Sequence, residues 1–203
     1  MIRSISTVLS GSRGPVVALG AAIIWLTFTD KKRAMVLIPI LTIGVFFLPT
    51  DNMAIERVLG IFKYLDLSAL ARLEIQESAL NDFLQNPLVG KHFMDASFGE
   101  GSWPHNFFLE AAMSMGIVGL TLSVVIVFAS FRAALAGVNR KHLLLVTLLV
   151  QALVAAQFSG SLFGGSMLFA LFAAVLALGI IYRRERLLLN RRSTPSKLNY
   201  QDI

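Results

Sequence analysis

The feature that most limits the fold is a series of long apolar segments separated by short basic loops. The apolar runs cover residues 15–29, 34–49, about 107–136, 143–158 and 166–182. Hydrophobic residues make up 56% of the chain, whereas average proteins are roughly 45–50% apolar. A soluble fold of this size could not bury so much apolar surface. The sequence therefore predicts an integral membrane protein.

The charged residues indicate how these segments cross the membrane. Lys and Arg gather in loop 30–33, in turn 139–142 and in the tail 183–203, whereas residues 51–104 carry eight acidic and four basic side chains. Because loops rich in Lys and Arg stay in the cytoplasm, we expect the acidic region on the outer side. The same rule places the first residues outside, which suggests that the chain continues a longer polytopic protein.

The resulting prediction is an all-α polytopic membrane protein with about five transmembrane helices and one long extracytoplasmic loop containing an amphipathic helix. Residues 1–50 would form a hairpin of two spans, 51–106 the loop, 107–182 a bundle of three spans and 183–203 a basic cytoplasmic tail. Apolar residues recur every three to four positions over 68–85, which predicts the amphipathic helix. Asn86-Pro87 should end that helix. The third span begins at Phe107 or Gly116, and Gly116 and Gly119 would allow close helix contact.

Composition also excludes several kinds of site. The net charge of +6 does not indicate a nucleic-acid partner, because the basic residues follow the membrane segments and are not interleaved with aromatic residues. Cysteine is absent, which excludes disulfides and zinc–thiolate sites. No phosphate-binding loop, zinc-helix motif or nucleophile elbow occurs. We therefore expect neither a metal nor a cofactor.

His105 is the first candidate for a catalytic residue, because it lies where the polar loop meets an apolar run. Pro104 restricts the backbone before it, and a helix is expected to begin just after it. The dipole at a helix N-terminus favours the neutral imidazole, which can take a proton from a hydroxyl as a general base. The alternative is a histidine that simply lies in the interfacial zone.

Arg13 and Arg72 are the candidate anion-binding residues. A guanidinium group stays charged and binds phosphate through two parallel hydrogen bonds. Arg13 precedes the first span on the outer side, against the usual distribution of charge; the alternative is an anchor at the membrane edge. Arg72 lies in the amphipathic helix, where the alternative is an i,i+4 contact with Gln76 or an ion pair with a glutamate of the same helix.

Asn106 and Glu110 are expected to support this site without reacting. Asn106 could hydrogen-bond a sugar, and the alternative is a cap on the helix that follows. Glu110 lies inside the apolar run, where a lone carboxylate is costly, so it should have a partner such as an arginine or a helix dipole. We expect Glu110 to orient a neighbouring group rather than to act as an acid.

Taken together, four pieces of the pattern resemble the C-terminal half of the O-antigen ligase and O-antigen polymerase superfamily. They are Ser12-Arg13-Gly14 before a span, Arg72 upstream of Asn86-Pro87-Leu88-Val89-Gly90, the run from His105 to Glu110, and Gly116-Ile117-Val118-Gly119. The similarity covers about residues 8–180, nearly the whole chain. Gly90-Lys91-His92 departs from the family pattern, which more often has a second glycine there.

Members of the family that this chain resembles are inverting glycosyltransferases with many spans that need no metal. The resemblance implies transfer of a glycan from an undecaprenyl-diphosphate carrier to an acceptor glycan or lipid A-core, at the outer face of the inner (cytoplasmic) membrane, in lipopolysaccharide or polysaccharide biosynthesis. It implies that Arg13 and Arg72 bind the diphosphate and that His105 activates the acceptor hydroxyl. Family members have many more spans, so this chain is expected to be a truncated copy or a portion of a longer protein.

Three alternatives stay open at this point. O-antigen ligases, exopolysaccharide polymerases and protein-glycosylating oligosaccharyltransferases share the motif and differ in their acceptor. A second alternative is a non-catalytic fragment. The third is a transporter or channel subunit for polysaccharide export, which would use ionisable residues lining a path through the membrane; the apolar segments here contain few of them.

Overall fold

The computed structural model describes residues 13–32, 35–36, 39, 67–94, 103–138, 141–158, 161–162 and 164–193. Its elements are, in chain order, α2 (Arg13–Thr29), α5 (Leu67–Gln85), α6 (Phe107–Ala133), the π-helix η2 (Ala134–Val138), α8 (Leu143–Ala155) and α9 (Ser166–Ser193). The all-α prediction is therefore confirmed for the described residues. Most of the predicted second span, residues 34–49, lies outside them.

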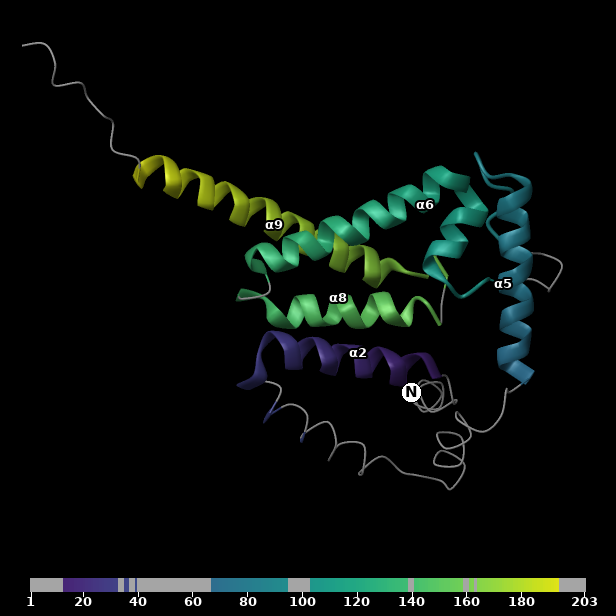
Figure 1. Cartoon of the computed structure of the whole chain (residues 1–203), viewed down its shortest axis with the longest axis horizontal. Coiled ribbons are helices and arrows are strands. Elements are labelled where there is room, and N and C mark those ends of the chain that lie inside the picture. The colour runs from purple at the N-terminus through teal and green to yellow at the C-terminus, as the bar shows by residue number, and fades with distance from the viewer. Residues whose placement is uncertain are drawn as a thin grey trace, which may run out of the picture.

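Four of the helices form a bundle, and α5 lies across one end of it (Figure 1). α2 packs along α8, α8 packs on α9, and α9 also contacts α6 and η2. α5 contacts α6. Because α2 begins, α8 ends and α6 begins on the side where α5 lies, residues far apart in the sequence meet at this end.

The predicted helix positions agree with these elements. α5 ends at Gln85, because the proline of Asn86-Pro87 disfavours a helical residue before it. α2 and α8 cover most of the predicted segments 15–29 and 143–158. α9 begins at Ser166 as expected and continues past Tyr182 to Ser193, so the start of the basic tail is helical.

A hydrophobic core joins the start of α6 to α8 and α9. Phe107, Val146 and Phe172 belong to one buried cluster. The rings of Phe107 and Phe172 lie 6.2 Å apart between centroids, and Phe172 is 1% exposed. The residue that opens α6, two positions after His105, is therefore anchored in the core.

α6 is bent at Gly116, where φ is 61° and ψ is −148°, a backbone conformation that is almost restricted to glycine. In a straight helix the amide of Ile117 would donate to the carbonyl of Met113. Here the Ile117 amide donates to the carbonyl of Pro87 at 2.7 Å. The Met113 carbonyl accepts from the amide of Lys91 at 2.9 Å. The turn after α5 therefore fills the break in α6 and satisfies both backbone groups.

Two glycines allow this close approach. A Cβ atom on Gly116 would lie 2.5 Å from the carbonyl carbon and oxygen of Leu88. Gly90 has φ of 76°, and a Cβ atom there would lie 2.5 Å from the carbonyl carbon of Ser114. Larger side chains at either position would push backbone away from backbone. The close contact expected at Gly116 is thus made with the turn after α5, not with another helix.

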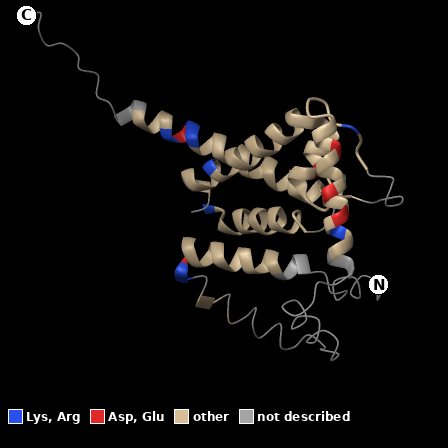
Figure 2. Ribbon diagram, turned by 45° about the vertical axis from the view of Figure 1, so that its right-hand side comes forward, with Lys and Arg blue, Asp and Glu red and all other residues tan. Residues whose placement is uncertain are grey.

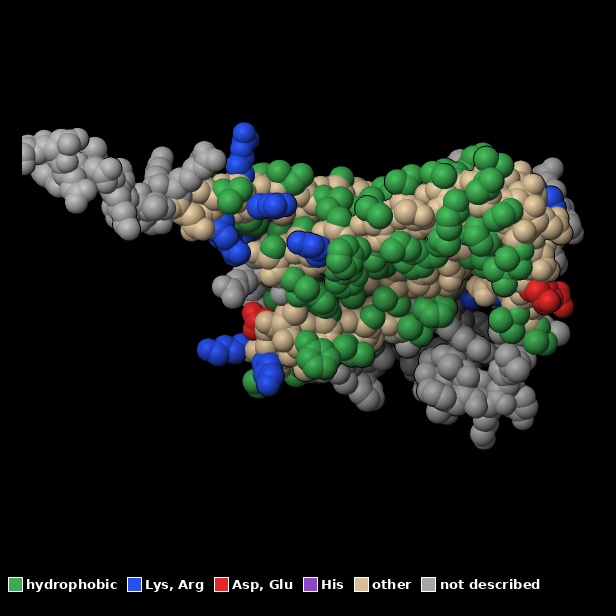
Figure 3. Space-filling view, turned by 45° about the horizontal axis from the view of Figure 1, so that its top comes forward, with side chains coloured by type: hydrophobic (Ala, Val, Ile, Leu, Met, Phe, Trp, Pro, Cys, Tyr) green, Lys and Arg blue, Asp and Glu red, His purple; other side chains and the backbone are tan. Residues whose placement is uncertain are grey.

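Charged side chains separate between the two ends of the bundle (Figure 2). Most of the acidic side chains lie along α5, whereas most Lys and Arg side chains lie at the far end, at the end of α2, just before α8 and along α9. Between the ends, the face in Figure 3 is largely covered by hydrophobic side chains, and Leu122 and Phe128 of α6 are 59% and 62% exposed.

Two of the described helices, Phe107–Ala136 and Ser166–Asn190, are long and apolar enough to cross a membrane. Val17–Thr29 and Leu143–Ala155 are apolar but shorter. The expected number of five spans therefore stays a prediction.

Candidate active site

His105 lies in the loop that leads into α6. Its φ is 51°, the left-handed region that costs a non-glycine residue roughly 1–2 kcal/mol. Backbone strain of this kind clusters at functional sites. Asn106 follows as the N-cap of α6, and its side-chain oxygen accepts from the amides of Phe108 and Leu109 at 3.2 and 3.0 Å. The capping interpretation of Asn106 is therefore confirmed.

Two hydrogen bonds from other helices hold this loop. The side-chain amide of Gln76 on α5 donates to the carbonyl oxygen of Pro104 at 3.1 Å. The backbone amide of Phe107 donates to the carbonyl oxygen of Ala156, just after α8, at 3.1 Å. Pro104 itself is fully buried. The backbone on both sides of His105 is thus fixed, by α5 before it and by the end of α8 after it.

Arg72 lies one helical turn before Gln76, so both side chains leave α5 on the same side. Its Nη1 atom donates to the carbonyl oxygen of Phe158 at 3.4 Å, which uses one of the five N–H donors of a guanidinium group. This contact reaches across the end of the bundle. It differs from the local contacts, with Gln76 or a glutamate of α5, that were the alternative for Arg72.

Arg13 is the first residue of α2, and its side chain lies outside the described part of the structure. Because α2 begins at the α5 end of the bundle, the Arg13 backbone is on the same side as Arg72 and His105 (Figure 1). The structure thus brings Arg72 and the His105 loop to one end, and the role of Arg13 stays a prediction.

Glu110 is buried in the first turns of α6, with 2% of its surface exposed. Its Oε1 atom accepts from the backbone amide of Leu162, in the loop before α9, at 2.8 Å. The expected partner was an arginine or a helix dipole, and the observed partner is a single backbone amide from a distant loop. The carboxylate therefore holds the α8–α9 loop against α6.

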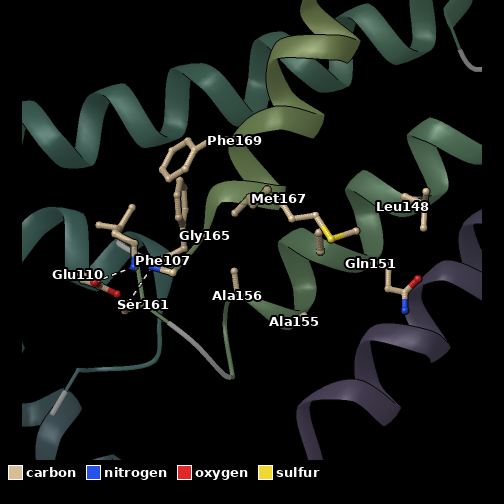
Figure 4. Close-up of a pocket in the computed structure, with 14 residues that line it drawn as sticks. Phe107, Glu110, Leu148, Gln151, Ala155, Ala156, Ser161, Gly165, Met167 and Phe169 are labelled. Carbon is tan, nitrogen blue, oxygen red and sulfur yellow. Dashed lines mark hydrogen bonds between the residues drawn. The ribbon is translucent and has the colours of Figure 1, made fainter. Parts of the chain in front are cut away.

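A cavity of about 360 Å³ lies beside this carboxylate, between α6, α8 and the start of α9 (Figure 4). Its lining is mostly apolar, with Glu110 and Gln151 at opposite ends. A second cavity, of about 150 Å³, is lined by Phe93, Glu110, Ser114, Met115 and Leu162. Glu110 and Leu162 line both cavities, so the hydrogen bond between them lies at the boundary of the two.

A buried carboxylate fixes the end of α5 to the turn that follows. Asp82 is 6% exposed and lies 2.6 Å from Nζ of Lys91 and 2.8 Å from Nε2 of His92. Lys91 is also the residue whose backbone amide bonds to α6. α5, the turn and the first half of α6 therefore form one connected unit, which carries the residues of the candidate site.

This end of the molecule combines an imidazole on a strained loop with a guanidinium group on α5. In the part of the chain that the structure describes, no group of three or more His, Asp or Glu side chains could hold a metal ion. The chemistry that these side chains offer is proton transfer by the imidazole and neutralisation of an anion by the guanidinium.

Sequence reasoning missed three features of the site. It treated Gln76 only as a neighbour of Arg72, although the spacing of four residues already placed both on one side of α5. It also missed the Leu162 amide as the partner of Glu110, and no local signal indicates that contact. No pattern in the sequence indicated that Gln151 would line the far end of the larger cavity either.

The chain is similar in sequence to O-antigen ligases. The family model described as O-antigen ligase matches residues 1–124. The chain is also similar to an O-antigen ligase from Pseudomonas aeruginosa, with 31% identity over 170 residues, 77% of this chain. The match covers 39% of that relative, so the chain spans well under half of its length. No solved structure gives a significant match.

Proposed function

Since the chain belongs to the O-antigen ligase family, we propose that it forms the catalytic part of a membrane glycosyltransferase. In this proposal a glycan passes from an undecaprenyl-diphosphate carrier to a hydroxyl of lipid A-core or of another acceptor glycan. The supporting observation is that α5 contacts the His105 loop through Gln76 and the end of α8 through Arg72. The proposed base and one proposed anion-binding group therefore belong to one connected end of the bundle.

The reaction needs a base for the acceptor and positive charge for the leaving group. Neutral His105 takes the proton of the acceptor hydroxyl while the oxygen attacks the anomeric carbon of the donor. The new carbon–oxygen bond forms opposite the breaking bond to the diphosphate, so the configuration at that carbon inverts. Arg72 and Arg13 neutralise the departing diphosphate.

Asn106 and Glu110 support these groups through the backbone. Asn106 caps the N-terminus of α6 immediately after His105, and so fixes the backbone on the C-terminal side of His105. Glu110 holds the loop before α9 through the Leu162 amide. Neither side chain exchanges a proton with substrate in this proposal.

The distribution of charge supports a site on the outer face of the inner membrane. The end far from α5 carries Lys31, Lys32 and Lys141, together with the arginines that begin at Arg183. Because such residues favour the cytoplasmic side of a membrane, the end with α5 and His105 would face away from the cytoplasm. Lipid-linked glycans exposed on that face would be on the same side of the membrane as His105.

Replacing His105 by alanine in the complete protein tests this function. Transfer from a lipid-linked donor, measured in membrane vesicles, should fall by about 10²–10⁴-fold, the usual contribution of a general base. His142→Ala is the matched control, because His142 lies at the other end of the bundle, 2.8 Å from the hydroxyl of Tyr182. The control should keep the wild-type rate. An equally active His105→Ala protein would refute the assignment of the base.

A further inference from the structure

We propose that Gln76 is a positioning residue that sets the placement of His105 relative to Arg72. The inference rests on the proposed function of those two residues. From the sequence, the only role suggested for Gln76 was a contact with Arg72. The starting point is the hydrogen bond from the Gln76 amide to the Pro104 carbonyl, at 3.1 Å.

Hydrogen bonds form a closed ring through α5, the His105 loop and the end of α8. Its three bonds run from Gln76 to Pro104 at 3.1 Å, from the Phe107 amide to Ala156 at 3.1 Å, and from Arg72 to Phe158 at 3.4 Å. The single helical turn between Arg72 and Gln76 closes the ring. His105 lies inside it, between Pro104 and Phe107, so each bond affects the distance from His105 to Arg72.

Gln76 acts on the peptide group that determines the direction of the His105 side chain. The Pro104 carbonyl and the His105 nitrogen belong to the same peptide plane. Fixing the oxygen fixes that plane, and with it the φ of 51° at His105. The strain of a non-glycine residue in this region and the net free energy of one hydrogen bond are of the same order. Without the Gln76 bond, the plane can therefore rotate and carry the imidazole to another position.

Thr147 allows this effect to be separated from the loss of a hydrogen bond elsewhere in the bundle. Its hydroxyl donates to the carbonyl oxygen of Leu143 at 2.8 Å, and the residue is buried. That bond lies in the first half of α8 and is not part of the ring. Each substitution removes one side-chain bond to a backbone carbonyl, whereas only the loss at Gln76 should change catalysis.

The first test compares Gln76→Met, which removes the amide donor, keeps the length of the side chain and adds no charge beside Arg72, with Thr147→Val, in the complete protein in membrane vesicles. For Gln76→Met we expect kcat to fall by about tenfold, the factor that corresponds to one hydrogen bond. The KM for the lipid-linked donor should stay within about twofold, because the Arg72 side chain is unchanged. Wild-type kcat in Gln76→Met, or the same loss in Thr147→Val, would overturn the proposal. A raised KM at unchanged kcat would also overturn it, because Gln76 would then act through donor binding.

The second test places Gln76→Met in the His105→Ala background. If Gln76 acts through His105, the double variant should be no slower than His105→Ala alone. A further tenfold loss would contradict the proposal. The thermal unfolding midpoints of Gln76→Met and Thr147→Val should both lie within about 4 °C of wild type, and a selectively lower midpoint for Gln76→Met would mark a purely structural role.

These outcomes separate the two proposals. Full activity of His105→Ala would remove the proposed function, and the positioning role would fall with it. An inactive His105→Ala protein together with a fully active Gln76→Met protein would remove the positioning role alone.

Discussion

Replacing Gly116 by alanine tests the contact between the bend of α6 and the turn after α5. The added Cβ atom would lie 2.5 Å from the carbonyl carbon and oxygen of Leu88 and 2.6 Å from the carbonyl oxygen of Pro87. These are backbone atoms, which cannot rotate away as a flexible side chain can. Alanine must also adopt the φ of 61° and ψ of −148° that Gly116 has, or α6 must lose its bend.

The expected cost follows from these two routes. Holding a non-glycine residue in that region costs about 1–3 kcal/mol. Pushing the turn away breaks the bonds from Ile117 to Pro87 and from Lys91 to Met113, and each buried group left unpaired costs about 1–3 kcal/mol. Straightening α6 would pair the Met113 carbonyl with the Ile117 amide, but it would still leave the Pro87 carbonyl and the Lys91 amide of the turn unpaired. We therefore expect Gly116→Ala to destabilise the protein by about 3 kcal/mol or more.

The assay is thermal unfolding in detergent micelles, followed by far-ultraviolet circular dichroism at one scan rate. For a chain of this size, a loss of about 3 kcal/mol should lower the midpoint by about 6–12 °C. Gly20→Ala is the control, because a Cβ atom on Gly20, inside α2, would meet nothing within 4 Å. Its midpoint should stay the same or rise, since alanine favours a helix over glycine by about 1 kcal/mol. A midpoint of Gly116→Ala within about 2 °C of wild type would refute the reasoning.

Two further predictions concern the site. Arg72→Lys keeps the positive charge and loses the planar fork, so the KM for the lipid-linked donor should rise by about tenfold, or 1.4 kcal/mol; an unchanged KM in a donor titration would indicate a general charge effect. Asn106→Ala removes the cap of α6 and should lower the free energy of unfolding by about 1 kcal/mol, whereas Asn106→Asp should keep most of the stability that the cap contributes. Equal thermal unfolding midpoints for the two variants would contradict the capping role.

Local signals in the sequence were enough to place the described helices, apart from the bend in α6. The apolar periodicity over 68–85 and the Asn86-Pro87 stop correspond to α5, which covers Leu67–Gln85. Asn106 before an apolar run predicted a helix start, and α6 begins one residue later. These features depend on neighbours within a few positions, where spacing and capping preferences carry information.

The contacts that build the candidate site join residues far apart in the chain, and sequence spacing carries no information about them. Gln76 and Pro104 are 28 positions apart, Glu110 and Leu162 are 52 apart, and Arg72 and Phe158 are 86 apart. A buried glutamate needs a partner on physical grounds, so the existence of a contact at Glu110 was predictable. Which group supplies it depends on how the helices pack. The bend of α6 was missed for the same reason, because glycine alone does not reveal that a turn occupies the gap.

The contact at the bend also limits which insertions and deletions this region can accept. Pro87 and Lys91 are separated by the same number of residues as Met113 and Ile117, and the two pairs bond in antiparallel order. If one residue were inserted in only one of the two segments, the two hydrogen bonds could not form together. Segments outside both pairs can vary in length without changing this pairing. Length variation among related sequences should therefore spare 87–91 and 113–117 and accumulate outside them.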